Sequence, residues 1–185
     1  MPTQEFVLED NTWWTTTAVL PSWSGFQKRD GPYGATSSTT PSNGEVKIVF
    51  APEGRGSEPL TANERSLVGW TVDNEEAVAD ALLKALWAKY PELQDLHACD
   101  EEEVAKYLPD IHDIQGFRRL IGLHCIHVHP IEADGMPYVG YEFGCTWDAE
   151  HGLGVLMHGA EVLEIGGADT ALLRWLAERY AKRET

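Results

Sequence analysis

The chain has 185 residues, which is the length of about one domain. It carries 30 acidic residues against 14 basic ones, and its formal net charge is −16. Nucleic-acid binding requires clustered Lys and Arg, and anionic membrane surfaces repel acidic proteins, so this charge argues against both kinds of partner. We therefore expect one domain over residues 1–185.

The N-terminal part predicts two strands separated by a long loop. Residues 13–20 and 46–50 are rich in aromatic and β-branched side chains, which favour strands. Residues 28–44 are dominated by Gly, Pro, Ser and Thr and show no apolar periodicity. We expect these residues to form a long flexible loop.

A helix and an acidic segment follow. Thr61 and Glu64 have the spacing of a capping box at a helix start. A helix is also expected over residues 73–90, where Pro91 should end it. Residues 92–113 contain eight acids and a single base and predict an acidic connector. The helix prediction depends on apolar residues that recur every four positions on one face: Val78, Leu82, Leu86 and Tyr90.

The C-terminal third predicts a β-meander followed by a helix over residues 169–182. The pair Asp134-Gly135 favours a tight turn, and Asp169 is a suitable N-cap. The fold class expected from all these elements is α+β, with an antiparallel sheet packed against two main helices. That sheet combines the N-terminal strands with four C-terminal ones, at residues 123–131, 138–147, 153–157 and 162–165.

The cysteines and the N-terminus bear on the compartment. Cys99, Cys125 and Cys145 are odd in number and include no CxxC pair, so reduced thiols are a simpler interpretation than a disulfide framework. The first ten residues contain no basic residue and lead into no long apolar run, as a signal peptide would require. We expect a cytoplasmic protein.

The first candidate site is the segment HCIHVH, residues 124–129. On a strand, Cys125, His127 and His129 share one face, and imidazoles and a thiolate are good zinc ligands. Alternate residues of a straight strand lie about 6.5–7 Å apart, however, so three in a row converge poorly on one ion. We favour an apolar face formed by Ile126 and Val128, with the histidines on a solvated or partly packed face and no metal or cofactor; metal binding is the alternative.

The second candidate site is the segment WDAEHG, residues 147–152. Asp148, Glu150 and His151 could serve general acid–base chemistry, and an exposed Trp147 could anchor a protein interface. Asp and Gly also favour turns for purely conformational reasons. We favour turn chemistry here, with partner binding and catalysis as the alternatives.

Three segments of the chain resemble an uncharacterised bacterial domain family of unknown function: LPSWSGFQKRDGPYG, PYVGYEFGCTWDAEHGLGVLMHG and EIGGADTALLRWLA. The most specific block is FGCTWDAEHGLGVL. Because the family has no established activity, the resemblance implies no catalytic or binding residue. In size and charge the chain is also similar to immunity proteins, which block a toxin made by the same cell.

These features favour a non-enzymatic acidic module that binds a basic protein, in the manner of an immunity protein. The alternative is a hydrolase-type or metal-dependent enzyme that uses the His, Asp and Glu residues of the C-terminal meander. We assign no catalytic residue, no metal ligand and no cofactor. The residues predicted to bind the partner are acidic or aromatic: Asp100, Glu101, Glu102, Glu103, Trp147, Asp148 and Glu150.

Overall fold

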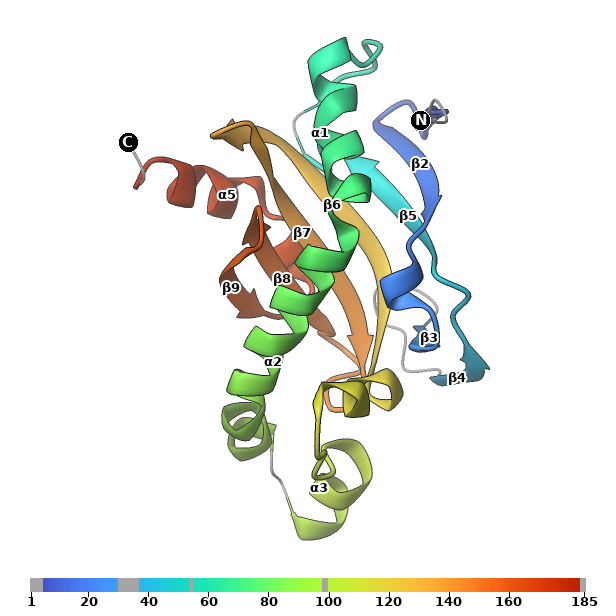
Figure 1. Ribbon diagram of the computed structural model, residues 1–185, viewed down its shortest axis with the longest axis vertical. Coiled ribbons are helices and arrows are strands. Elements are labelled where there is room, and N and C mark those ends of the chain that lie inside the picture. Colours follow the sequence, from blue (N-terminus) through green and yellow to red (C-terminus); the bar gives the residue numbers. More distant parts are fainter. Residues whose placement is uncertain (1–4, 30–36, 54, 98–99, 184–185) are drawn as a thin grey trace.

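The computed structural model describes residues 5–29, 37–53, 55–97 and 100–183. Within them, the main sheet has seven strands in the order β1-β2-β5-β6-β7-β8-β9 (Figure 1). The parallel pair in this sheet is β5–β6, and the other neighbours are antiparallel. The strands are β1 (Val7–Glu9), β2 (Trp13–Val19), β5 (Glu45–Phe50), β6 (Ile121–Ala133), β7 (Met136–Cys145), β8 (Leu153–His158) and β9 (Glu161–Gly166). These strands, the antiparallel meander β6–β9 and the helices confirm the predicted α+β class.

Helices cover both faces of this sheet. α1 and α2 lie between β5 and β6 in the chain and run diagonally across one face (Figure 1). α4 and α5 contact β6, β7 and β8 from the other face. The helices are α1 (Ala62–Asp73), α2 (Glu75–His97), α3 (Glu101–Tyr107), α4 (Asp169–Leu172) and α5 (Arg174–Ala181), and two short 3₁₀ helices span Pro21–Trp23 and Ile114–Arg119.

The larger core lies between the sheet and α1–α2. The residues predicted to line one face of α2 are all buried, and Leu82 and Leu86 are fully so. They share this core with alternate residues of the strands, such as Ile126 and Val128 of β6. Trp23 packs in the same core, with its ring 5.3 Å from that of Phe143. Burial of aliphatic and aromatic side chains therefore holds this face together.

On the opposite face, α4 lies directly on the backbone of the sheet. A Cβ added to Gly140 of β7 would sit 1.9 Å from the carbonyl oxygen of Ala171, and one added to Gly154 of β8 would sit 2.3 Å from that of Gly167. Only glycine leaves room for such an approach. The apolar cluster on this face is small, and its buried members are Tyr138, Leu156, Leu176 and Ala177.

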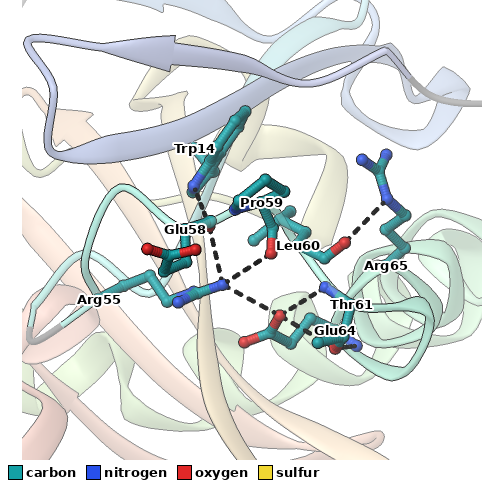
Figure 2. Close-up of polar contacts among 8 residues, drawn as sticks. All are labelled: Trp14, Arg55, Glu58, Pro59, Leu60, Thr61, Glu64 and Arg65. Carbon is teal, nitrogen blue, oxygen red and sulfur yellow. Dashed lines mark hydrogen bonds and ion pairs between the residues drawn. The ribbon is translucent and has the colours of Figure 1, made fainter.

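The loop that leads into α1 is fixed by polar contacts, which Figure 2 shows. The Arg55 guanidinium donates a hydrogen bond to the carbonyl oxygen of Glu58 (2.9 Å) and lies 3.3 Å from the carboxylate of Glu64. Trp14 of β2 donates its indole N–H to the same Glu58 carbonyl (2.9 Å). Thr61 and Glu64 form the predicted capping box. These contacts join β2 to the start of α1.

Pro91 does not end the second helix as predicted, because α2 continues to His97. Proline removes one backbone donor, but tertiary contacts beyond it compensate. Leu93 is buried, and the Gln94 amide donates a hydrogen bond to the carbonyl oxygen of Leu108 (2.9 Å). The acidic segment 92–113 therefore contains the end of α2 and the whole of α3.

Two other predicted boundaries need correction. Residues 28–44 include parts of a two-stranded ribbon, β3 (Gln27–Arg29) and β4 (Ser37–Pro41), while residues 30–36 lie outside the described part of the chain. The helix predicted over residues 169–182 is divided into α4 and α5 by the extended backbone of Leu173. Ala168, rather than Asp169, occupies the N-cap position of α4.

Among the described residues, none of the helices is both long and apolar enough to cross a lipid bilayer.

Candidate functional site

Two places in the fold hold the residues singled out in the sequence. The first is a buried cluster on the α4–α5 side of the sheet, formed by Cys125 and His127 of β6 and Glu142 of β7. One ligand atom of each lies within 4.8 Å of the others. The His127 Nε2 and Glu142 Oε2 atoms are 2.7 Å apart. In the part of the chain that the structure describes, this is the one such grouping of three His, Cys, Asp or Glu side chains.

The strand register explains why these three side chains meet. Glu142 lies directly opposite Cys125 in the β6–β7 ladder, and His127 lies opposite Gly140. Side chains on one face of neighbouring strands form a compact triangle, whereas three in a row on one strand do not. Alternation along the strand correctly placed Cys125 and His127 on one face, but it did not indicate Glu142 of β7.

His129 does not join this cluster. Its Nε2 atom lies 3.0 Å from the carbonyl oxygen of Ala171 in α4, and the side chain is fully buried. The pKa of His129 is lowered to about 4, mainly by burial, with smaller contributions from His127 and Arg174 and an opposing one from the hydrogen bond to the Ala171 carbonyl. The imidazole is therefore neutral at pH 7 and donates to α4.

The Cys125 thiol is not a nucleophile in this environment. Burial raises its pKa to about 12, and the negative charge of Glu142 acts in the same direction. Thiols react as thiolates, so a thiol that stays protonated at neutral pH is inert. The cluster also leaves the buried Nδ1 atom of His127 without a hydrogen-bond partner among the described residues.

A polar strip lies beside the cluster on the neighbouring strands β5 and β1. Lys47 of β5 is the ladder partner of Cys125. Its ammonium group lies 2.5 Å from the carboxylate of Glu9, which also accepts a hydrogen bond from Thr15 (2.9 Å). These contacts lower the pKa of Glu9, mainly through the hydrogen bond from Lys47. The Lys47 and Glu9 side chains are 45% and 40% exposed, so the strip is open to water.

The strip also borders a groove of about 910 Å³ beside β1, β2 and α1. Glu9, Thr15 and Lys47 line it together with Arg65 and Asp73 of α1. No signal in the sequence predicted this groove, because it depends on how the edge strands meet α1.

The second place is the end of the molecule where α3 meets the loop after β7. The Thr146 hydroxyl donates a hydrogen bond to the carbonyl oxygen of Tyr107 at 2.5 Å. The Trp147 ring contacts that of Tyr90 of α2 at a centroid distance of 6.3 Å. The end of the acidic helix α3 and Thr146, which directly precedes the segment 147–150, are thus in contact although they are far apart in the sequence.

The predicted partner-binding residues differ in what their side chains do here. Asp100, Glu102 and Glu150 are exposed. Trp147 is half-buried, and Asp148 accepts a hydrogen bond from the backbone N–H of His151 at 2.8 Å. Glu101 and Glu103 belong to α3, and their side chains lie outside the described part of the structure.

The segment 148–152 has the geometry of a turn. The Gly152 N–H donates to the carbonyl oxygen of Asp148, and Gly152 has a positive φ of 64°. The His151 ring is exposed and lies 3.1 Å from the Asp148 carboxylate. These contacts support the favoured turn interpretation.

A model of a known family matches residues 26–172 of the chain. The chain belongs to the DUF6985 family, a domain of unknown function. The predicted membership in an uncharacterised family is therefore confirmed. No curated protein and no solved structure matches the chain.

Both candidate sites lie inside the DUF6985 domain. The matched residues include Cys125, His127 and Glu142, and they also include α3 and Trp147. β1 and β2 precede the matched region and α5 follows it. The DUF6985 match carries no residue roles, so the interpretation of both sites depends on their geometry.

Proposed function

We propose that this protein is a non-enzymatic binding module of the bacterial cytoplasm that engages a basic protein, as an immunity-like inhibitor does. The observation that carries the proposal is the meeting of α3 with the loop after β7. It supports one continuous surface, which we call the acidic end and define by the exposed residues Asp95, Leu96, Asp100, Glu102, Tyr107 and Glu150.

The charge of the acidic end suits a basic partner. The whole chain carries a net charge of −16, and the segment 92–113 is its densest run of acids. Complementary charge speeds association and makes it dependent on salt. An acidic partner or a nucleic acid would be repelled by the same field.

Two apolar side chains give the acidic end a means to hold a partner. Leu96 at the end of α2 is 76% exposed, and Tyr107 at the end of α3 is 38% exposed. The Lys106 ammonium lies 4.7 Å from the centre of the Tyr107 ring. Apolar and aromatic anchors ringed by polar residues are typical of protein interfaces.

The test compares two double variants with the same change in charge. Glu102→Lys with Glu150→Lys reverses charge on the acidic end. Glu132→Lys with Glu161→Lys reverses two exposed acids on the hairpins β6–β7 and β8–β9, at the opposite end of the meander. The wild type and both variants serve as baits in a native bacterial lysate at low and moderate salt, and bound proteins are identified by mass spectrometry.

We expect a basic protein that the wild type and the hairpin variant retain at low salt and that the acidic-end variant loses. With that protein purified, association with the acidic-end variant should be slower, and its rate should depend less on salt. Equal retention by both variants would contradict the acidic end as the site. A blank at both salt concentrations would contradict the proposed function.

The alternative function, a hydrolase-type or metal-dependent enzyme of the meander, receives less support. Asp148 is engaged in its own turn, where it accepts a hydrogen bond from the backbone N–H of His151. Reduced cysteines suit the cytoplasmic compartment that we propose.

A further inference from the structure

We infer that Cys125, His127 and Glu142 form a binding site for one divalent transition metal ion, with Zn²⁺ as the expected ion. This site lies on the sheet face beside α4 and is separate from the acidic end. The inference therefore does not depend on the proposed protein-binding function.

The first argument is convergence. A metal site needs ligand atoms from more than one element that point to a common centre. Cys125 and His127 alternate on β6, and Glu142 reaches the same point from β7. Their ligand atoms already lie within 4.8 Å of one another without any change of backbone.

The second argument is that the cluster contains a buried carboxylate and a buried imidazole nitrogen without a hydrogen-bond partner among the described residues. All three side chains are buried, each with 5% relative exposure, and one carboxylate among them must be accommodated away from water. The His127–Glu142 contact satisfies one nitrogen of the imidazole, while His127 Nδ1 has no partner within the described residues. A bound cation would be a direct counter-charge for Glu142.

The third argument is the donor set. A thiolate, an imidazole and a carboxylate together match Zn²⁺, which binds sulfur, nitrogen and oxygen. Mg²⁺ and Ca²⁺ prefer oxygen ligands throughout and are disfavoured by Cys125. Three protein ligands leave a fourth coordination position for water.

Binding has a defined proton balance. The Cys125 S–H bond breaks, its electron pair forms the bond to the metal, and the proton is released to solvent. His127 binds as the neutral imidazole and Glu142 as the carboxylate. No oxidant or reductant takes part. Zinc affinity should therefore weaken as the pH falls.

The test uses untagged full-length protein that has been stripped of metal with a chelator. Zn²⁺ is titrated calorimetrically in two buffers of different ionisation enthalpy, so that proton release is measured together with stoichiometry. We expect one Zn²⁺ per chain with net proton release. Loading with Co²⁺ should give a sulfur-to-cobalt charge-transfer band.

The informative variants are Cys125→Ser and Glu142→Gln, which keep the size of each side chain. Changes in the shell around metal ligands cost about 10- to 100-fold in affinity, so loss of a direct ligand should weaken Zn²⁺ binding by about 100-fold or more. Cys125→Ser should also abolish the charge-transfer band. Cys145→Ser is the matched control, because Cys145 is a buried thiol that belongs to the core on the other face.

Thermal unfolding of each metal-free variant checks that it is folded. Zn²⁺ should raise the melting temperature of the wild type and of Cys145→Ser, but not that of Cys125→Ser. The inference is overturned if the wild type binds no Zn²⁺. It is also overturned if Cys125→Ser and Glu142→Gln both bind Zn²⁺ as tightly as Cys145→Ser does. Either result would leave the outcome of the lysate experiment unaffected.

Discussion

On the face covered by α1 and α2, the sheet presents side chains such as Ile126, Val128 and Phe143, which pack into a large apolar core. On the face covered by α4 and α5, the same strands present His127, His129 and Glu142. The first face is stabilised by burial of apolar surface, whose free energy is roughly proportional to the area buried and does not depend on direction. The second is held by close backbone contact and polar pairing, which depend on detailed fit.

This difference shows where the molecule can carry specific chemistry. Buried polar groups lower stability unless they are paired, so their concentration on one face needs a reason. Some of these buried polar side chains have a structural reason to be there. The His158 ring stacks on that of Tyr138 at a centroid distance of 4.4 Å, and its Nε2 atom lies 3.0 Å from the Ala133 carbonyl oxygen. The Cys125 cluster pairs His127 Nε2 with Glu142 but leaves the buried His127 Nδ1 without a partner among the described residues, which is why we assign it to a metal.

The largest expected effect comes from deleting the same apolar side chain on each face. Leu86 lies in the large core and Leu176 in the small cluster beneath α5, and both are buried. We expect Leu86→Ala to lower the free energy of unfolding by about 4 kcal/mol and Leu176→Ala by about 2 kcal/mol, within the range for such cavities. Urea unfolding measures both. Equal losses would contradict the contrast between the faces.

The close contact of α4 with the sheet gives the next effect. Gly140→Ala places a methyl group against the Ala171 carbonyl, and we expect a loss of about 3 kcal/mol, at the upper end for overpacking. Gly69→Ala is the matched control on α1, because nothing lies within 4 Å of its added Cβ. That variant should gain about 0.5–1 kcal/mol. A loss in Gly69→Ala, or none in Gly140→Ala, would contradict the packing described.

Between about pH 7.5 and about pH 5, a pH dependence should arise from His129 on the second face. His129 has a folded pKa of about 4, below its unfolded value of 6.5, so the unfolded chain takes up a proton first as the pH falls. The free energy of unfolding therefore decreases as the pH falls from 6.5 towards 4. Between about pH 7.5 and about pH 5 we expect the free energy of unfolding to fall by about 2 kcal/mol.

His129→Gln isolates this effect, because glutamine can still donate to the Ala171 carbonyl but does not titrate. Unfolding is measured in a chelating buffer, so that metal binding does not contribute. The difference between wild type and variant should shrink or change sign as the pH falls. Parallel pH profiles would show that His129 is not the group responsible.

The smallest effect concerns the entry to α1. Thr61→Ala removes the side chain that accepts the Glu64 N–H, and a lost N-cap costs about 1 kcal/mol. α1 should keep its helical structure, because buried Leu67 and Val68 hold it to the sheet. Circular dichroism and urea unfolding test both points. A loss of more than about 3 kcal/mol would show that the cap, rather than burial, secures this face.

Many elements of this fold could be predicted from the sequence. Apolar and β-branched runs predicted β2, β5 and the meander β6–β9, and residues typical of turns mark the ends of several of these strands. Asp134 and Gly135 both have positive φ, as a tight hairpin requires. The extension of α2 beyond Pro91 was not predictable, since it depends on contacts with residues 108–110.

The candidate site was predicted only in part, for a related reason. Alternation along β6 placed Cys125 and His127 together, but the register with β7 is a tertiary property. One signal was available: Glu142 is the single charge in the otherwise apolar β7, where burial requires a partner. Which histidine meets it depends on this register, which places Glu142 opposite Cys125 and diagonally beside His127.

The parallel pairing of β5 with β6 also has a consequence for synthesis of the chain. About 70 residues separate Phe50 from Ile121, so β5 leaves the ribosome several seconds before its partner at about 5–20 residues per second. During that interval the apolar edge of β5 is exposed on a nascent chain that can pair only with β2. The antiparallel meander, by contrast, can form as soon as each hairpin emerges. Translation speed between β5 and β6 should therefore influence how much of this protein reaches its folded state.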